Sequence, residues 1–251
     1  MLSLCVAVAL LTPQESAAEL VGRMLRHYDG GNSLTGTIRM VQSVQNISIG
    51  IDTYVQWEKP SKLFIRQDRK NSEARSFFVT SDGTLFSYDL PEERVGAPGE
   101  RLVEQVTQAG KQLTYREIYA VASRSLADRS APLDIAIART DDLKYIRNQW
   151  ATLEMLDREV PDGVKAVGGN WRLYASSPAS GTYEMWIESA TGNLKKYIHR
   201  ETFQPNTTTL DEKFRSRKVD LNVGPITIVT VWDLDLKVGG SPDASLFKVI
   251  K

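Results

Sequence analysis

Short runs of alternating apolar and polar residues, separated by turn residues, limit most strongly how this chain can fold. From Ile47 to Trp57 the odd positions are apolar apart from one threonine, whereas the even positions are mostly polar. This period of two is typical of a β-strand and predicts that the odd face is buried. Between Tyr54 and Leu90, further runs follow breaks at 59–62 and 81–83. Such runs predict an antiparallel meander.

Helical spacing appears in three places. A hydroxyl cap at Thr12 with Glu15 predicts a helix that begins there and ends near Gly30. A second capping box, Thr114 with Glu117, precedes a segment at helical spacing, and 132–138 predicts a third helix. The apolar positions of the first two helices are Ala17, Leu20, Val21, Met24 and Tyr28, then Ile118, Val121, Ala122 and Leu126. The later helices separate two blocks of strands, which suits a lid or plug.

Strands return after Trp150. Tyr183, Met185 and Ile187 share one strand face, and the segment 226–238 alternates over its whole length. Turns are expected at 161–163 and 190–193, while Leu173 and Ala175 are expected to extend the face of Trp171. The chain of 251 residues suits one domain, mainly β with an α+β arrangement.

Charge and terminal composition narrow the function classes. Lys plus Arg and Asp plus Glu number 31 each, so the basic excess of a nucleic-acid-binding domain is missing. The apolar run Leu2–Leu11 followed by Ser16-Ala17-Ala18 predicts a signal peptide over 1–18, although no Lys or Arg precedes the run. The alternative is a buried first helix turn. We therefore expect a mature domain over 19–251 and an exported, periplasmic location.

The only cysteine, Cys5, lies inside the predicted signal peptide. Its removal would exclude disulfides and thiol chemistry from the mature chain. Lipid attachment at Cys5 is disfavoured, because Leu4 stands where a small residue is wanted.

No pattern in the chain predicts catalysis. The two histidines, His27 and His199, have no metal-ligand spacing, and no nucleophile elbow, phosphate loop or dinucleotide fingerprint occurs. The acidic pairs at 92–93, 141–142 and 211–212 lie in polar contexts typical of solvated loops. We therefore predict no enzyme activity, no catalytic residue, no metal site and no cofactor.

Large apolar side chains on the predicted buried faces are the candidate ligand-binding residues. Indole and thioether groups are adaptable surfaces that suit a cavity wall. The candidates are Trp57, Leu63, Trp171, Met185, Trp232 and Leu234. The alternative, that they fill an ordinary core, is favoured on the residues alone, because barrel interiors need bulky side chains in any case.

Several short motifs, taken in order, resemble the periplasmic outer-membrane lipoprotein carrier-like (LolA/LolB-like) superfamily, in a branch of uncharacterised periplasmic proteins. The basic residue before Pro60, followed by Ser61-Lys62-Leu63-Phe64, is similar to a strand end of that family. The Asp82-Gly83 turn into an aromatic strand, the stretch 186–194 and the terminal Leu246-Phe247 are similar to later family features.

The resemblance implies a half-open antiparallel β-barrel wrapped around a helical lid or plug, which binds lipid tails and catalyses nothing. In the family, an arginine before the proline contacts carbonyl groups of the lid helices. Here that position is Lys59, which cannot form the same planar fork. The expected function is an exported binding protein for lipid or acyl chains. The alternative is an envelope regulatory or scaffold module that binds a membrane protein.

The expected partners follow from this function. They are a lipid or an acylated protein, and envelope membrane proteins under the alternative. Nucleic acid is not expected as a partner, and we expect a monomer.

Overall fold

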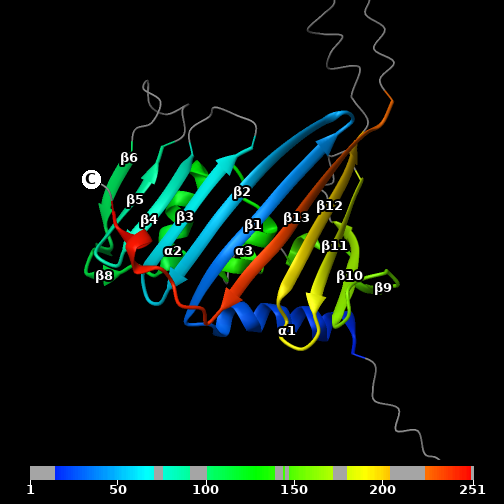
Figure 1. Ribbon diagram of the computed structural model, residues 1–251, viewed down its shortest axis with the longest axis horizontal. Coiled ribbons are helices and arrows are strands. Elements are labelled where there is room, and N and C mark those ends of the chain that lie inside the picture. Colours follow the sequence, from blue (N-terminus) through cyan, green and yellow to red (C-terminus); the bar gives the residue numbers. More distant parts are fainter. Residues whose placement is uncertain are drawn as a thin grey trace, which may run out of the picture.

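One curved antiparallel sheet, wrapped around three helices, makes up most of the protein (Figure 1). The computed structural model describes residues 15–70, 76–90, 101–138, 144, 147–171, 180–203 and 224–249. Within these residues the sheet has eleven strands in the order β6-β5-β4-β3-β2-β1-β13-β12-β11-β10-β9. The sheet strands are β1 (Ser33–Val44), β2 (Ile47–Glu58), β3 (Lys62–Arg69), β4 (Phe77–Asp82), β5 (Leu85–Asp89), β6 (Arg101–Gln105), β9 (Glu154–Leu156), β10 (Val164–Trp171), β11 (Ser180–Glu188), β12 (Leu194–Phe203) and β13 (Ile226–Val238).

The helices lie on the concave side and at the lower end of the sheet in Figure 1. Helix α2 packs against β3, β4 and β5, helix α3 against β1, and helix α1 against α3, β9 and β11. The remaining elements are α1 (Ala17–Gly30), α2 (Tyr115–Ala122), η2 (Ser123–Ser125), α3 (Ala131–Ile137), η3 (Ala244–Phe247) and a separate pair, β7 (Thr107–Gln108) with β8 (Lys111–Gln112). In the described part, β6 and β9 are the two edges of the sheet, which does not close on itself. The predicted half-open β-barrel around a helical plug is confirmed.

Alternation decides which side chains of the central strands face the helices. In the register of β1 with β2 and β13, Met40 lies opposite both Ile51 and Trp232. The odd positions of β2 from Ile51 to Trp57 are buried, as predicted. The prediction is wrong for Ile47 and Ile49, which are 71% and 51% exposed. These two positions lie at the start of β2, beside the turn that joins β1 to β2, and Figure 1 shows this turn at the upper end of the sheet.

Helix α1 begins later than the sequence predicts. Its capping box is Ser16 with Glu19: the Glu19 backbone N–H donates to the Ser16 hydroxyl, and the Ser16 backbone N–H donates to the Glu19 carboxylate. The predicted start of the helix at Thr12 is wrong, since Glu15 and Ser16 precede α1 and Glu15 forms ion pairs with Arg23 and Lys165. The predicted apolar stripe from Ala17 to Tyr28 is confirmed, since all five of its members are buried.

The two later helices follow the prediction closely. The Thr114–Glu117 capping box forms, and α3 spans almost the predicted segment. Two positions of the predicted stripe differ: Val121 is 42% exposed although its helical spacing predicted burial, and Leu126 lies beyond α2 and η2 and is only partly buried. Val121 lies beside the edge strand β6, where a shallow depression of about 450 Å³ separates α2 from Leu102.

The turn between β11 and β12 positions α1 against the sheet. Gly192 has φ +83°, and a Cβ there would lie 3.1 Å from backbone atoms of Arg23. Only glycine permits both this conformation and this close approach. The hairpin predicted at 190–193 is therefore confirmed, and its glycine has a second role in packing.

Several predictions lie outside the described residues. These concern Leu2–Leu11, Cys5, Thr12, Leu173, Ala175 and the acidic pairs at 92–93, 141–142 and 211–212. No helix in the described part of the chain is both long and apolar enough to cross a bilayer.

Candidate functional site

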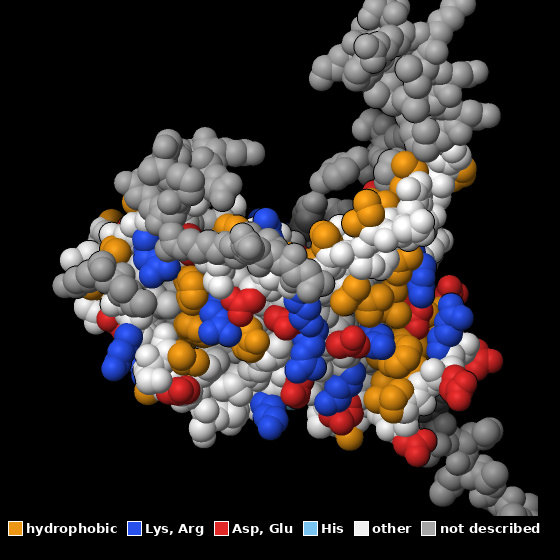
Figure 2. Space-filling model, turned by 45° about the horizontal axis from the view of Figure 1, so that its top comes forward, with side chains coloured by type: hydrophobic (Ala, Val, Ile, Leu, Met, Phe, Trp, Pro, Cys, Tyr) orange, Lys and Arg blue, Asp and Glu red, His pale blue; other side chains and the backbone are white. Residues whose placement is uncertain are grey.

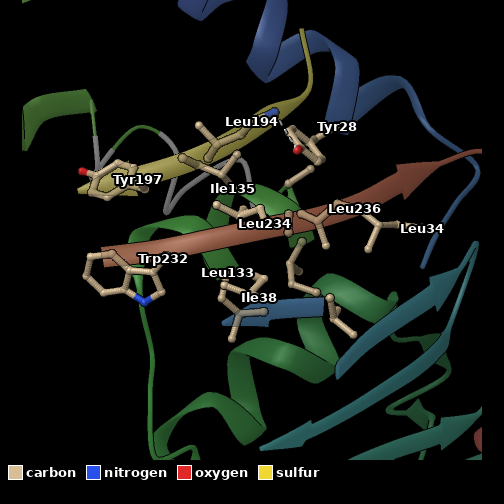
Figure 3. Packing of buried hydrophobic residues seen from close by; sticks show 14 of the residues in the cluster. Tyr28, Leu34, Ile38, Leu133, Ile135, Leu194, Tyr197, Trp232, Leu234 and Leu236 are labelled. Carbon is tan, nitrogen blue, oxygen red and sulfur yellow. Dashed lines mark hydrogen bonds between the residues drawn. The ribbon is translucent and has the colours of Figure 1, made fainter. Parts of the chain in front are cut away.

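The concave face of the sheet is apolar, and the helical insertion (α2, η2 and α3, Tyr115–Ile137) covers much of it. Figure 3 shows Leu133 and Ile135 of α3 among side chains from β1, β12 and β13. These sheet side chains are Leu34, Ile38, Leu194, Leu234 and Leu236, all of which are buried. The insertion therefore occupies the place where a ligand of this face would lie.

All six predicted ligand-binding residues lie in or beside this core. Five are buried, namely Trp57, Leu63, Met185, Trp232 and Leu234, and Trp171 is partly buried at the end of β10. Their side chains pack against one another and against the helices. In this closed arrangement they fill a core, which is the alternative that the residues alone favoured.

Trp57 contacts both helices of the insertion. Its indole N–H donates a 3.0 Å hydrogen bond to the carbonyl oxygen of Ala136 at the end of α3. Its ring stacks on Tyr115 of α2, with 4.5 Å between the ring centroids. Because Trp57 is fully buried on β2, this contact joins the insertion to the centre of the sheet.

The loop between η2 and α3 is fastened to the sheet by three residues, Gln67, Asp128 and Trp232, which we call the latch. The Gln67 amide donates 2.7 Å to the Asp128 carbonyl oxygen, and its own oxygen accepts from the Asp128 backbone N–H at 3.0 Å. The Trp232 indole N–H donates to the Asp128 carboxylate, also at 3.0 Å. The latch therefore joins β3 and β13 through the insertion.

Burial raises the pKa of the Asp128 carboxyl, and the hydrogen bond from the Trp232 indole opposes this rise. A carboxylate held by so few donors in an apolar setting is costly to keep charged. The latch thus fastens the insertion by polar contacts within a mostly apolar core. Burial there makes the charged form of Asp128 costly.

Sequence reasoning identified Trp232 but missed Gln67 and Asp128. Gln67 follows Leu63 and Ile65 at a period of two, so a polar residue on a buried strand face was a readable signal. Asp128 carried no signal, because its partners are 61 and 104 residues away.

Lys59 lies at the lower end of the sheet. Its ammonium is 3.4 Å from the carbonyl oxygen of Asp29, in the last turn of α1. The resemblance implied a carbonyl of the lid helices, and the observed partner belongs to α1 instead. The guanidinium of Arg116, on α2, also lies 3.4 Å from that carbonyl oxygen and 2.7 Å from the Asp29 carboxylate. The Lys59 side chain and α2 are thereby linked through the end of α1, and the neighbouring Pro60 carbonyl oxygen accepts directly from the Tyr115 backbone N–H at 2.8 Å.

Aromatic rings gather on the concave face at the β9–β13 side. Trp150 stacks on Tyr183, and Trp171 lies against His199 with ring centroids 5.0 Å apart. Tyr197 meets Trp232 edge-on at 5.7 Å, as Figure 3 shows. The cluster joins the latch to the far side of the sheet.

Three buried polar atoms in this cluster make no hydrogen bond of good geometry within the described residues: Trp150 Nε1, which lies beside the Tyr197 hydroxyl, Tyr197 Oη and His199 Nε2. Burial raises the pKa of Tyr197, and the nearby indole of Trp150 opposes that rise. Burial also lowers the pKa of His199, which favours the neutral imidazole. Unpaired buried polar atoms are unfavourable, and a polar ligand group or water would satisfy them.

Neither histidine stands in a ligand cluster. Burial lowers the pKa of His27, which packs edge-on against Tyr28. Among the described residues, no three His, Cys, Asp or Glu side chains lie close enough together to hold a metal ion.

Comparisons with known proteins give likenesses of structure only. No family model matches the chain, and no curated protein matches it. The chain is similar to LolA superfamily protein NE2245 from Nitrosomonas europaea, at 13% identity and a TM-score of 0.33, covering 94% of this chain and 98% of that one. It is also similar to LprF from Mycobacterium bovis, at 12% identity and a TM-score of 0.40, covering 91% and 95% of the two chains.

A third likeness is to a DUF1329 family protein from Desulfovibrio piger, at 12% identity and a TM-score of 0.32, covering 92% and 95%. Because these TM-scores are all 0.40 or lower, we assign the fold of this chain from its own sheet order and helices.

Proposed function

We propose that this chain is an exported, non-enzymatic binding protein for lipid or acyl chains that works in the cell envelope as a monomer. Its ligand would be a lipid or an acylated protein. The observation that carries the proposal is the covering of the apolar concave face by short helices instead of by a second sheet or long helices. Helices α2 and α3 have 8 and 7 residues, and a few polar contacts fasten them.

An acyl chain would bind by displacing the insertion from part of this face. The helices contribute apolar side chains such as Ile118, Leu133 and Ile135, which are chemically interchangeable with methylene groups. Sheet side chains such as Leu234 would keep an apolar neighbour throughout. For the sheet side chains the change in free energy is therefore small, because apolar contacts are exchanged for apolar contacts, whereas the displaced helix side chains lose burial.

The aromatic cluster offers a place for the polar end of such a ligand. A carboxyl or ester group there would accept from the Trp150 indole N–H and the Tyr197 hydroxyl, which lie beside each other without a hydrogen bond of good geometry. The neutral form of His199, favoured by burial, suits an uncharged ester or a protonated acid.

Chain burial alone supplies useful affinity. Each methylene contributes roughly 0.8 kcal/mol, so about ten methylenes contribute roughly 8 kcal/mol, in the range of micromolar binding. Opening the insertion reduces this affinity, because the binding-competent state is then only partly populated.

Export belongs to the proposal through the signal peptide predicted over 1–18. Cleavage before Glu19 would remove Glu15 and Ser16, and with them the ion pairs to Arg23 and Lys165 and the cap of α1. N-terminal sequencing of the native protein tests this, and a chain that still begins at Met1 would contradict export by this signal.

The binding proposal is tested with fatty acids that carry bromine atoms, which quench tryptophan emission on contact. We expect saturable quenching, with the Kd falling roughly tenfold for every two added methylenes until the site is full. The variant Leu102→Ser/Val121→Ser, at the surface depression beside β6, should bind equally well. Quenching that does not saturate, or that this variant removes, would refute binding on the concave face.

A further inference from the structure

The upper end of the β1–β2 hairpin exposes large apolar side chains to solvent. Ile47 is 71% exposed, Ile49 is 51% exposed and Val41 is 44% exposed. On the adjacent strand β13, Ile226, Ile228 and Val229 are partly exposed, as the burial pattern of that strand shows. We call residues 40–51 together with 226–232 the hairpin end.

The hairpin end contains no charged residue, although a quarter of the chain is charged. Neither 40–51 nor 226–232 includes Asp, Glu, Lys or Arg. On β2, β1 and β13 the charges begin in one row, where Arg39 pairs in register with Asp52 on one side and Asp233 on the other. On the flanking strands charges reach higher, because Arg69 pairs with Ile51, Arg200 with Val229 and Glu201 with Ile228. Figure 2 shows the same separation: uncharged side chains dominate the protruding upper right of the described surface, and charged ones gather lower down.

Apolar side chains occupy both faces of this end. Ile47 and Ile49 share the concave face with Ile51 and Trp57, whereas Val41 alternates with the buried Met40 and so points to the convex face. A protein partner that docks on a sheet covers one face. An apolar layer of a membrane would instead surround the projecting end and contact both of its faces.

We propose that the hairpin end inserts into the surface of a lipid bilayer. The charged row at Arg39, Asp52 and Asp233 would then stay at the level of the headgroups. Lys70 and Arg200 on the flanking strands lie beside the same end, where basic side chains reach headgroup phosphates.

The contact would also give the concave face a source of acyl chains, a consequence that rests on the proposed function. From Ile49 the apolar face continues without a charged residue to Ile51, Met40 and Trp232, at the edge of the insertion. A chain that leaves the bilayer at the hairpin end would therefore meet only uncharged side chains up to the latch, and Gln42 and Thr230, the one polar pair on this path, are hydrogen-bonded to each other.

The test is flotation of the full chain with vesicles of phosphatidylethanolamine and phosphatidylglycerol. Ile47→Ser/Ile49→Ser should lower the vesicle-bound partition coefficient at least about tenfold, because two exposed isoleucines no longer enter the apolar layer. The matched control Leu102→Ser/Val103→Ser removes two exposed apolar side chains from β6 and should bind within about twofold of the parent.

A second variant keeps the proposal falsifiable without loss of an apolar side chain. Ile47→Trp should show emission that shifts to the blue on vesicles and is quenched by brominated lipid, whereas Val103→Trp should not respond. The proposal would be overturned if Ile47→Ser/Ile49→Ser bound vesicles as well as the parent chain, or if the emission of Ile47→Trp did not change on vesicles. It would also be overturned if this end captured a soluble protein and the chain did not bind vesicles.

The two proposals fail separately. Binding of a free brominated fatty acid, measured without vesicles, should survive Ile47→Ser/Ile49→Ser. If the parent chain floats with vesicles but does not bind the free fatty acid, only the proposed function is refuted. If it binds the fatty acid but does not float with vesicles, only the bilayer contact is refuted.

Discussion

Replacing Trp232 with phenylalanine tests whether the latch holds the helical insertion against the sheet. The change keeps an aromatic ring on β13 and removes the indole N–H that donates to the Asp128 carboxylate. A hydrogen bond to a charged group contributes about 1.5–3 kcal/mol, and the loss falls on a buried acceptor. Trp232 is 8% exposed, so water cannot readily replace the donor. We expect the free energy of unfolding to fall by this amount, plus the effect of the smaller ring.

The variant Trp171→Phe is the control for the effect of the smaller ring. Trp171 lies on the same concave face at the end of β10, packed against His199 and Tyr183. Unfolding in urea, followed by circular dichroism, should show that Trp232→Phe loses at least about 1 kcal/mol more than Trp171→Phe. Binding of a hydrophobic dye should rise only for Trp232→Phe. Equal losses and equal dye binding would refute the latch.

The same substitution has a consequence for pH. Burial raises the pKa of the Asp128 carboxyl in the folded protein, so the folded state binds this proton more readily than the unfolded state does. The contribution of Asp128 to stability is therefore full below the unfolded pKa and is lost as the pH rises through the raised folded pKa. Trp232→Phe removes a group that opposes the rise and should widen this window. Asp128→Asn has no titrating group at this position and should abolish this part of the pH dependence. The test is to measure the unfolding midpoints of the parent chain and both variants from about pH 4 to about pH 7.

Three further substitutions test other contacts. Lys59→Leu should change stability by under about 0.5 kcal/mol and leave dye binding unchanged, because the contact to Asp29 is long and exposed; increased dye binding would restore Lys59 as a lid contact. Thr114→Ala, which removes the hydroxyl that caps α2, should destabilise the protein by about 1 kcal/mol and raise dye binding, and no change in either would show that α2 does not depend on its cap. Gly192→Ala should destabilise the protein by more than about 1 kcal/mol, since its positive φ and its closeness to Arg23 both oppose a side chain, whereas Gly30→Ala, with open space around it, should cost less; equal effects would contradict the packing described for α1.

Local patterns sufficed for the strands and for most of the helices. The alternation in 226–238 and in 183–187 gave the buried faces of β13 and β11, because a period of two needs no knowledge of the partner strand. The capping box at Thr114 worked for the same reason, since both of its groups lie within one helical turn.

Features that depend on distant parts of the chain could not be predicted. The exposure of Ile47 and Ile49 follows from how far the insertion reaches along the sheet, and that is a property of tertiary packing. Asp128 likewise gained its role only when the fold placed it beside Trp232. The start of α1 was missed although its signal is local, because the Ser16–Glu19 capping box competes in the sequence with the pair Thr12 and Glu15.

The most direct test of acyl-chain binding on the concave face is photocrosslinking with a fatty acid that carries a diazirine near the end of its chain. After irradiation, the labelled peptides are identified by mass spectrometry, with an excess of unlabelled fatty acid as the competitor. The account predicts competed labels on β13 around Trp232 and Leu234 and on the insertion around Leu133, with more label in Trp232→Phe than in Trp171→Phe. Labels that resist competition, or that fall only on the surface around Leu102 and Val121, would contradict it.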